Sequence, residues 1–213
     1  MMTPERTVGR LSLYRRLLVA MRNRGTRHVF SHELASAAGV TAAQVRRDMM
    51  TVGCSGSPAR GYDVPELIEH IGLFLDADEP EAVALVGVGN IGRAMMAYFE
   101  GRRPKLKMVA AFDQDGSKTN RVVHGCRCYP IEDMASVVDD RGIRVAMVAV
   151  PAEAAQDVAD VLVRAGVRGL LNFAPVAIRV PEHVYVEDID VTTSLEKVAF
   201  FARQKRAHKV SVS

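Results

Sequence analysis

A single short stretch, residues 83–98, constrains the fold more than any other part of the sequence. It reads VALVGVGNIGRAMMAY, an apolar run that passes through three glycines into a segment of helical periodicity. Gly87, Gly89 and Gly92 have the spacing G-x-G-x-x-G, which allows a tight turn, a close backbone approach to a pyrophosphate, and close packing of a helix on a strand. We therefore predict a strand, a phosphate-binding turn and a helix that begins near Ile91.

An acidic residue lies where this motif needs one. The segment KMVAAFD predicts a second strand that ends at Asp113, 21 residues after Gly92. A carboxylate at this spacing accepts hydrogen bonds from ribose hydroxyls and repels a 2′-phosphate. Because Gln114 and Asp115 follow it instead of an arginine, the sequence favours NAD(H) over NADP(H) as the cofactor.

The chain beyond the second strand alternates between helical and strand patterns, as a doubly wound parallel sheet does. We therefore predict an α/β fold with a Rossmann-like parallel sheet, with helices at 131–140 and 152–165 and strands at 145–150, 169–172 and 184–188. The last helical segment, 195–205, has no further strand to cover, so we expect its apolar stripe to contact another subunit. The stripe consists of Leu195, Val198, Ala199, Phe201 and Ala202.

The first part of the chain differs from the rest in charge. Residues 1–61 hold ten arginines, no lysine and three acids, which gives a formal charge of +7, whereas the rest of the chain carries −4. Guanidinium groups suit the recognition of phosphate and guanine, so nucleic acid is the leading candidate partner. On charge alone, a solvated basic face is the alternative.

The helical pattern of this basic segment predicts a helix-turn-helix. A first helix covers 10–21, and a short second helix covers 31–38 with Ser31 as its cap. A third helix follows Thr41, whose side chain and that of Gln44 fit a capping box. Two short helices joined by a glycine-containing turn are typical of DNA-binding domains.

The third helix would present a polar face to DNA. Gln44 and Arg47 lie on that face, with Arg46 beside them. Glutamine can read adenine through two hydrogen bonds, and arginine can read guanine or hold phosphate. The Gly/Ser/Pro-rich segment 51–62 predicts the wing of a winged helix, with a small helical interaction domain as the alternative. The predicted DNA-binding residues are Ser31, Thr41, Gln44, Arg46, Arg47 and Arg60.

These patterns divide the chain into three parts. We predict a winged-helix domain over 1–78, closed by a helix in VPELIEHIGLFL, a Rossmann domain over 79–192, and a dimerisation helix and tail over 193–213. There is no run of 18 apolar residues and no signal-peptide pattern, so we expect a cytoplasmic protein without a membrane span. Three unevenly placed cysteines, and six scattered histidines without ligand spacing, predict structural thiols and no metal site, with a redox-active thiol as the alternative.

Four motifs together resemble the Rex family of redox-sensing transcriptional repressors. They are GVTAAQVRRD in the third helix, GVGNIGRA at the glycine turn, AVPAEAAQDVAD at the end of the strand over 145–150, and GLLNFAPV followed by VPEHVYVEDID. The resemblance implies a homodimer that binds double-stranded operator DNA, an inverted repeat, when NAD⁺ is bound or the site is empty. It also implies that NADH releases the DNA and that the C-terminal helix is exchanged between subunits.

The resemblance also assigns roles to individual residues. Arg46 and Arg47 match an Arg-Lys pair of the recognition helix, with Arg47 in the place of the lysine. Arg16, Tyr98 and Asp190 match a polar relay between the cofactor and the DNA-binding domain, in which Asp190 comes from the partner subunit. With the glycine motif and the walls expected for the nicotinamide, the cofactor set is Gly87, Val88, Gly89, Asn90, Ile91, Gly92, Tyr98, Asp113, Val150, Asn172, Phe173, Ala174 and Asp190.

Some positions depart from the family pattern. Thr51-Val52-Gly53 stands where relatives have Tyr-Phe-Gly, and Pro58-Ala59-Arg60-Gly61-Tyr62 stands in place of an Arg-Gly-Val-Gly-Tyr wing. Asp188 replaces an asparagine, and Val191 replaces an aromatic residue. These changes concern the operator sequence and the sensing of NADH rather than the fold.

A dehydrogenase is the main alternative to a sensor. It would need a proton donor beside the nicotinamide and a substrate domain. No tyrosine is followed four residues later by lysine, and an arginine-rich domain suits a substrate poorly. We therefore expect a repressor that senses the NADH/NAD⁺ ratio and has no catalytic role. The alternatives are an NAD-dependent oxidoreductase with an accessory basic domain, and a cofactor-binding interaction module whose basic face is merely solvated.

Overall fold

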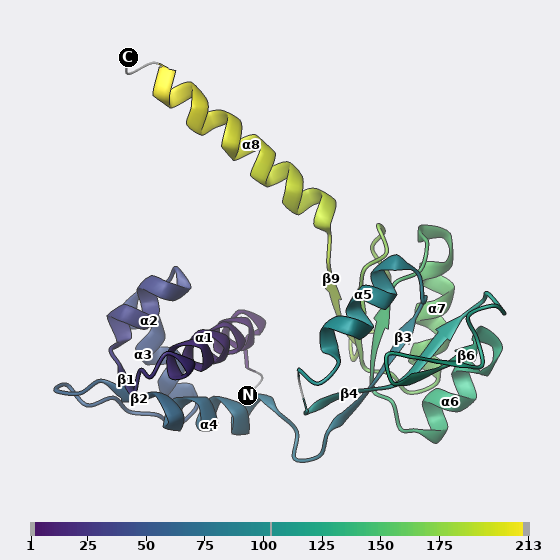
Figure 1. Ribbon diagram of the computed structural model, residues 1–213, viewed down its shortest axis with the longest axis horizontal. Helices are drawn as coiled ribbons and strands as arrows, with labels where there is room; N and C mark the ends of the chain where they lie inside the picture. The colour runs from purple at the N-terminus through teal and green to yellow at the C-terminus, as the bar shows by residue number, and fades with distance from the viewer. Residues whose placement is uncertain (1–2, 103, 211–213) are drawn as a thin grey trace. The chain divides into compact units, whose positions relative to one another are not determined.

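The computed structural model describes residues 3–102 and 104–210, with side chains through Gln204 (Figure 1). The chain divides into two compact units, Met1–Asp78 and Glu79–Ser213. None of the described helices combines the length and the apolar character that crossing a membrane requires.

The first unit has the predicted helices and a small antiparallel sheet. Its core lies where the helices meet and includes Leu11, Tyr14, Leu34, Val45 and Leu67. The first helix begins five residues before its predicted start, because the polar turn at its N-terminus has no apolar periodicity to reveal it. The elements are α1 (Glu5–Asn23), β1 (His28–Val29), α2 (Ser31–Ala38), α3 (Ala42–Thr51), β2 (Tyr62–Asp63) and α4 (Val64–Leu75).

The capping residues differ from the prediction at two helix starts. Ser31 is the first residue of α2 rather than its cap, because the preceding residue, Phe30, is extended and its N–H donates to the Glu33 carboxylate at 2.7 Å. At α3, the hydroxyl of Thr41 accepts the N–H of Gln44 at 3.1 Å, as predicted. The reciprocal half of that capping box is missing from the described contacts, because the Gln44 side chain bonds to Asp48 instead.

The segment predicted as the wing contains a short hairpin. Ser57 and Gly61 exchange backbone hydrogen bonds of 2.8 and 2.7 Å, which places Arg60 in the loop between them. Gly61 has a φ of +72°, and a Cβ there would lie 2.5 Å from the carbonyl oxygen of Val29. Only glycine fits this position, so the wing is held against β1.

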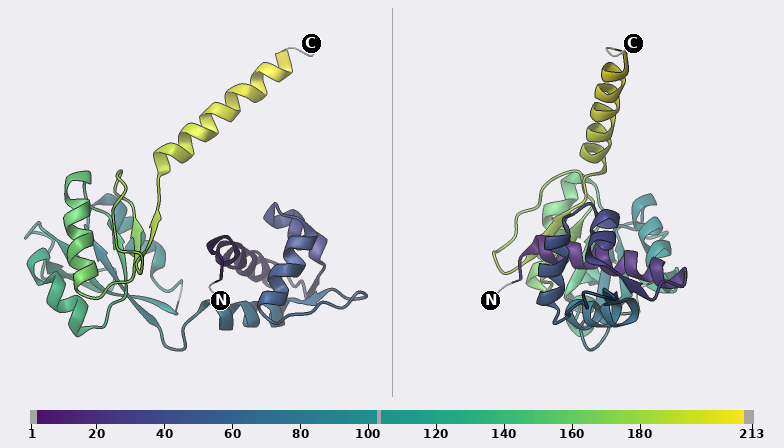
Figure 2. Two further views of the ribbon diagram at one scale, coloured as in Figure 1. Left: turned by 180° about the vertical axis from the view of Figure 1, so that it is seen from behind. Right: turned by 90° about the vertical axis from the view of Figure 1, so that its left-hand side faces the viewer.

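The second unit is a sheet with helices on both faces (Figure 1, Figure 2). Its strand order is β5-β6-β4-β3-β7-β8-β9, and neighbouring strands are parallel except for β5 and β6. The strands are β3 (Glu81–Val86), β4 (Leu106–Asp113), β5 (Arg121–Val123), β6 (Cys126–Pro130), β7 (Val145–Val148), β8 (Gly169–Asn172) and β9 (Tyr185–Asp188). This arrangement confirms the predicted parallel α/β sheet, to which the hairpin of β5 and β6 is an unpredicted addition.

Two cores lie on opposite faces of this sheet. Side chains of α6 and α7 pack on one face around Phe112 and Val148, and side chains of α5 pack on the other face around Leu85. The helices are α5 (Asn90–Phe99), the 3-10 turn η1 (Ile131–Asp133), α6 (Met134–Asp140) and α7 (Ala152–Arg164). The carboxyl ends of β3, β4 and β7 therefore meet at one edge, where such sheets bind ligands.

The C-terminal helix, α8 (Val191–Val210), begins before its predicted start. The large side chains of its predicted apolar stripe are exposed: Leu195 by 66%, Val198 by 65% and Phe201 by 59%. Large apolar groups that stand together in solvent are typical of a surface that another chain covers.

Candidate functional site

The glycine turn has the geometry that the motif predicts. Gly87 has a φ of +94°, and a Cβ on Gly92 would lie 2.0 Å from the carbonyl oxygen of Gly87, so glycine is needed at both positions. A Cβ on Gly89 would meet no atom within 4 Å among the described residues. The backbone at Gly89 is thus open to an approaching group, and α5 begins at the next residue, Asn90. Free amide groups at such a helix start suit a pyrophosphate.

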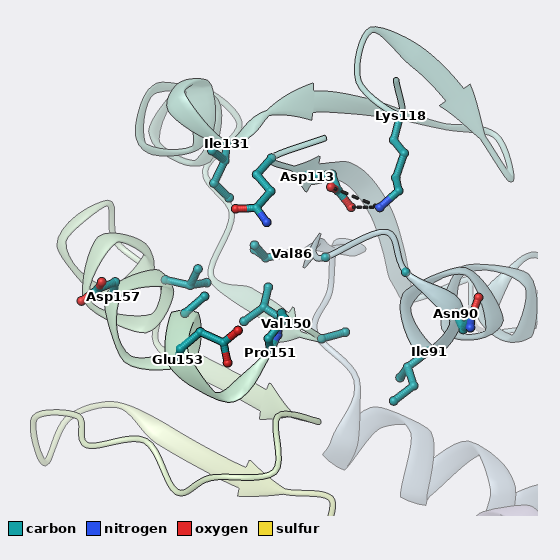
Figure 3. Close-up of a pocket in the computed structure, with 16 residues that line it drawn as sticks. Val86, Asn90, Ile91, Asp113, Lys118, Ile131, Val150, Pro151, Glu153 and Asp157 are labelled. Atoms are coloured by element: carbon teal, nitrogen blue, oxygen red, sulfur yellow. Dashed lines mark hydrogen bonds and ion pairs between the residues drawn. The ribbon is translucent and has the colours of Figure 1, made fainter. Parts of the chain in front are cut away.

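A cavity of about 720 Å³ opens beside this turn (Figure 3). Its volume is within the range of small-molecule and cofactor sites. Six of the predicted cofactor residues line it: Gly87, Gly89, Asn90, Ile91, Asp113 and Val150. The residues that sequence reasoning missed come from the loop after β4, from η1 and from α7, and they include Gln114, Lys118, Ile131, Glu153 and Asp157.

Asp113 ends β4 at the cavity wall and is 7% exposed. Its carboxylate accepts the backbone N–H groups of Val88 at 2.8 Å and of Asp115 at 2.9 Å. The ammonium of Lys118 lies 3.3 and 3.4 Å from its two oxygens (Figure 3). The cavity therefore presents a carboxylate and a cation side by side, both able to bond to ribose hydroxyls. No motif in the sequence indicates Lys118, because only the fold of the loop brings it to Asp113.

Of the residues predicted to surround the nicotinamide, Val150 lines this cavity, whereas Tyr98, Asn172, Phe173 and Ala174 are not among its lining residues. Asn172 is buried and donates to the carbonyl of Val176 at 2.8 Å and to the carboxylate of Asp188 at 2.7 Å. Its own oxygen accepts the N–H of Ala174 at 3.0 Å, so Asn172 organises the turn after β8. Ala174 and Asp190 line a second cavity of about 210 Å³. Phe173 packs against the core on the face that α5 covers.

The three relay residues lie on different elements. Tyr98 is half exposed on α5, with the Arg102 guanidinium 4.6 Å from its ring centre. Asp190 precedes α8 and accepts the N–H of Thr193 at 2.8 Å, and the Thr193 hydroxyl also donates to it. These bonds hold the pKa of Asp190 below its ordinary value. Arg16 is exposed on α1, in the other unit, so the relay stays a prediction.

The predicted DNA-binding residues gather in the first unit. Arg46 and Arg47 are exposed on α3. The Arg46 guanidinium donates to the hydroxyl of Ser31 at 3.1 Å, and that of Arg47 lies 3.5 Å from the side-chain oxygen of Gln44. Guanidinium groups thus cover the outer face of α3 and the start of α2, next to a wing that carries Arg60. This surface can bind phosphate and base edges.

The cysteines are buried as free thiols. Burial raises the pKa of the Cys126 thiol to about 11, which leaves little thiolate at neutral pH. No group of three potential ligand side chains in the described ranges could hold a metal ion.

Curated relatives match nearly the whole chain. The redox-sensing transcriptional repressor Rex of Desulforamulus reducens is 36% identical over 197 residues, which cover 92% of this chain and 94% of that protein. Rex of Carboxydothermus hydrogenoformans is 39% identical over 201 residues, which cover 94% and 97%. The chain belongs to the Rex family. A family model described as "CoA binding domain" matches residues 78–176, and one described as "Putative DNA-binding protein N-terminus" matches residues 3–49.

Solved structures agree with this assignment. RSP, described as a Rex-family repressor, is 26% identical and superposes with a TM-score of 0.89, covering 98% of this chain and 99% of RSP. RSP is also similar in its complex with β-NADH, and in its complex with β-NAD⁺ and operator DNA, with TM-scores of 0.88 and 0.87. These likenesses confirm the predicted architecture, an N-terminal DNA-binding domain followed by a Rossmann-like domain.

Proposed function

We propose that this Rex-family protein is a transcriptional repressor that senses the cellular NADH/NAD⁺ ratio. It binds operator DNA when NAD⁺ is bound or the site is empty, and NADH releases it. The proposal rests on two features that occur in the same chain. One is the glycine turn with Asp113 at its cavity, and the other is a winged helix whose α3 exposes Arg46 and Arg47. Matching relatives are named repressors, and RSP has been solved with both ligands.

The cofactor is NAD(H), and its adenosine half occupies the 720 Å³ cavity. The backbone at Gly89 and the start of α5 hold the pyrophosphate, while Asp113 and Lys118 bond to the ribose hydroxyls. The nicotinamide ring lies toward Ala174, past the turn that Asn172 organises. This ring carries the signal, because it is charged in NAD⁺ and neutral in NADH.

The working molecule is a homodimer in the cytoplasm, where its operator is. The exposed stripe of α8, which includes Leu195 and Phe201, supplies an apolar surface for the partner, and exchange of this helix between subunits would bury it. Two winged helices can then bind an inverted repeat, whose adjacent half-sites lie about 34–36 Å apart. A neutral nicotinamide is easier to bury, so NADH favours a closed dimer that no longer fits this spacing.

Switching of this kind requires a difference in affinity. A ligand shifts the equilibrium between two states only by the difference in its binding free energy to them. Near-complete switching needs a difference of about 5.5 kcal/mol. The proposed relay supplies part of this free-energy difference. It consists of Arg16, Tyr98 and Asp190, and Arg16 and Asp190 are bonded to each other in only one of the two states.

Selection of DNA from a random pool tests the proposal. The full chain is incubated with the pool, and bound DNA is sequenced after rounds with NAD⁺, with NADH and without cofactor. We expect an inverted repeat to be enriched with NAD⁺ or no cofactor, and little enrichment with NADH. Failure to retain any DNA at low salt would favour an interaction module. Multiple-turnover oxidation of NADH with a substrate would favour an oxidoreductase.

A further inference from the structure

A buried carboxylate in the first unit has no part in the function described so far. Asp48 lies on α3, the proposed recognition helix, and is 2% exposed. One of its oxygens accepts from Arg10 Nε at 2.6 Å and from the Tyr14 hydroxyl at 3.0 Å. Its other oxygen accepts from a second Arg10 nitrogen at 2.8 Å and from Gln44 Nε2 at 2.9 Å. Two bonds to each oxygen use the full accepting capacity of a carboxylate.

The arrangement keeps this carboxylate ionised inside the unit. Burial by itself raises the pKa of Asp48, but the hydrogen bonds from Arg10, Gln44 and Tyr14 outweigh burial and hold the pKa below its ordinary value. A two-pronged bond from a guanidinium has a defined geometry as well as strength. Arg10 and Tyr14 both belong to α1, so the carboxylate is fixed in position by a helix other than its own.

The fixed carboxylate determines which way the Gln44 amide faces. An ionised carboxylate can only accept hydrogen bonds, so Gln44 must turn its NH₂ group, and not its oxygen, toward Asp48. The oxygen consequently lies on the side of the exposed Arg47 guanidinium. Asp48 uses one amide hydrogen, and the Arg47 guanidinium donates to the oxygen at 3.5 Å, which leaves the other hydrogen and the second lone pair of the oxygen for a partner. That acceptor and donor are the pair with which glutamine reads adenine in the major groove.

We propose that Asp48, held by the two-pronged bond from Arg10, is a positioning residue that sets the amide of Gln44 to read an adenine in the operator. This inference rests on the proposed DNA-binding function. Because the amide is set before DNA arrives, less side-chain freedom is lost on binding than with a free glutamine. Asp48 itself lies beneath the surface and reaches no base.

A structural role alone would give a different pattern of mutational effects. If Asp48 only fastened α3 to α1, its loss would weaken binding to all sequences alike. As a positioning residue, it controls discrimination at one base position. Tyr14→Phe provides the matched control, since it removes one bond to Asp48 and leaves the contacts of Asp48 with Gln44 and Arg10 in place.

The experiment compares full-length wild type, Gln44→Ala, Asp48→Asn and Tyr14→Phe on DNA. Each variant is first checked for folding by circular dichroism and then used in selection from a random pool. Affinities are next measured for the selected operator and for copies changed at each base pair. In Asp48→Asn, the new amide can donate to the Gln44 oxygen and turn the Gln44 amide around. If this variant does not fold, Arg10→Lys replaces it, because lysine keeps the charge but loses the two-pronged bond.

We expect wild type to prefer adenine at one position of each half-site. Gln44→Ala and Asp48→Asn should both lose this preference at the same position by about 5- to 150-fold, the equivalent of about 1–3 kcal/mol. Tyr14→Phe should keep it, and the salt dependence of binding should not change in any of the variants, since no phosphate contact is removed.

Three results would overturn the inference, and they differ in what they say of the proposed function. A folded Asp48→Asn, or its Arg10→Lys substitute, that keeps the adenine preference lost in Gln44→Ala would show that Asp48 does not position the amide. A Gln44→Ala variant with unchanged base preference would show that Gln44 reads no base, while the repressor function stands. If wild type selects no DNA, the repressor function itself fails.

Discussion

The carboxylate of Asp113 has two kinds of neighbour in the cavity. It accepts the backbone N–H groups of Val88 and Asp115, which fix its position at the end of β4. It also lies beside the ammonium of Lys118, 3.3 Å away. Selectivity between NADH and NADPH therefore depends on a pair of opposite charges, of which the carboxylate repels a 2′-phosphate and the ammonium attracts it.

Asp113→Ala should lower NADH affinity by about 10- to 150-fold, the range for lost hydrogen bonds to a charged group. NADPH affinity should fall less or rise, because Lys118 then keeps only its ion pair with Asp115, at 3.6 Å, and can attract the 2′-phosphate. Calorimetric titration with both cofactors measures the change. Lys118→Ala in the same background is the control and should remove any gain in NADPH binding. An unchanged preference in Asp113→Ala would place the discriminating acid elsewhere, with Asp115 the nearest candidate.

The thiol of Cys126 should be unreactive in the folded protein. Burial raises its pKa to about 11, so at pH 8 almost none of it is thiolate, and it is also shielded from reagents. We expect a thiol-specific chromogenic reagent to modify Cys126 and Cys128 only after unfolding in denaturant, when the pKa returns to its ordinary value near 8.5. Rapid modification of either residue in the native protein would point to a redox-active thiol instead.

At the scale of elements, patterns of local spacing were predictable and loop geometry was not. The strand, turn and helix around Gly87 were found because Gly87 and Gly92 each meet a local steric demand and the spacing of the three glycines shows it. The hairpin of β5 and β6 was missed because Arg121–Val123 is too short to show periodicity, and the next strand, Cys126–Pro130, ends in a proline.

Prediction of the cofactor site from sequence has the same limit: local spacing reveals a residue, and contacts made by the fold do not. Asp113 was found by its distance along the chain from the glycines. Lys118, Glu153 and Asp157 were not, because the sheet topology brings them to the cavity from separate segments. The pairing of Asp48 with Arg10, 38 residues apart, also has no signal in a single sequence.

The apolar stripe of α8 should hold the dimer together. Leu195→Glu with Phe201→Glu would place two charges among side chains that the partner buries. Since burial of each side chain contributes about 1.5–3 kcal/mol, we expect the dimer to weaken by more than about 100-fold. Sedimentation velocity measures the change, with Lys197→Glu, which alters charge on the same helix outside the stripe, as the control. A double variant that sediments like wild type would rule out this surface as the dimer contact.

At the scale of the whole molecule, Asp190 has to be tested for two roles. It accepts hydrogen bonds from Thr193 at the start of α8, and in the proposal it also takes part in the relay. Asp190→Ala removes both the cap and the charge, whereas Asp190→Asn keeps a capping side chain and removes only the charge.

If the relay depends on the charge of Asp190, both variants should bind NADH as tightly as wild type does but release DNA less completely. Operator binding titrated with NADH, beside calorimetric NADH affinity, gives the two readings. If Asp190→Asn releases DNA as wild type does and only Asp190→Ala fails, the residue acts as a helix cap. Wild-type behaviour of both variants would remove Asp190 from the switch.

The central claim is that NADH and operator DNA bind to different states of one dimer. Such coupling is reciprocal, so DNA must weaken NADH binding by the factor by which NADH weakens DNA binding. The most direct measurement is the fluorescence anisotropy of labelled operator, titrated with the protein at one salt concentration with saturating NADH, with saturating NAD⁺, and with neither. We predict a Kd for DNA that is unchanged by NAD⁺ within a few-fold and is raised by NADH toward about 10⁴-fold, the value for near-complete switching. Equal Kd values under all three conditions, or tighter binding with NADH, would contradict the account.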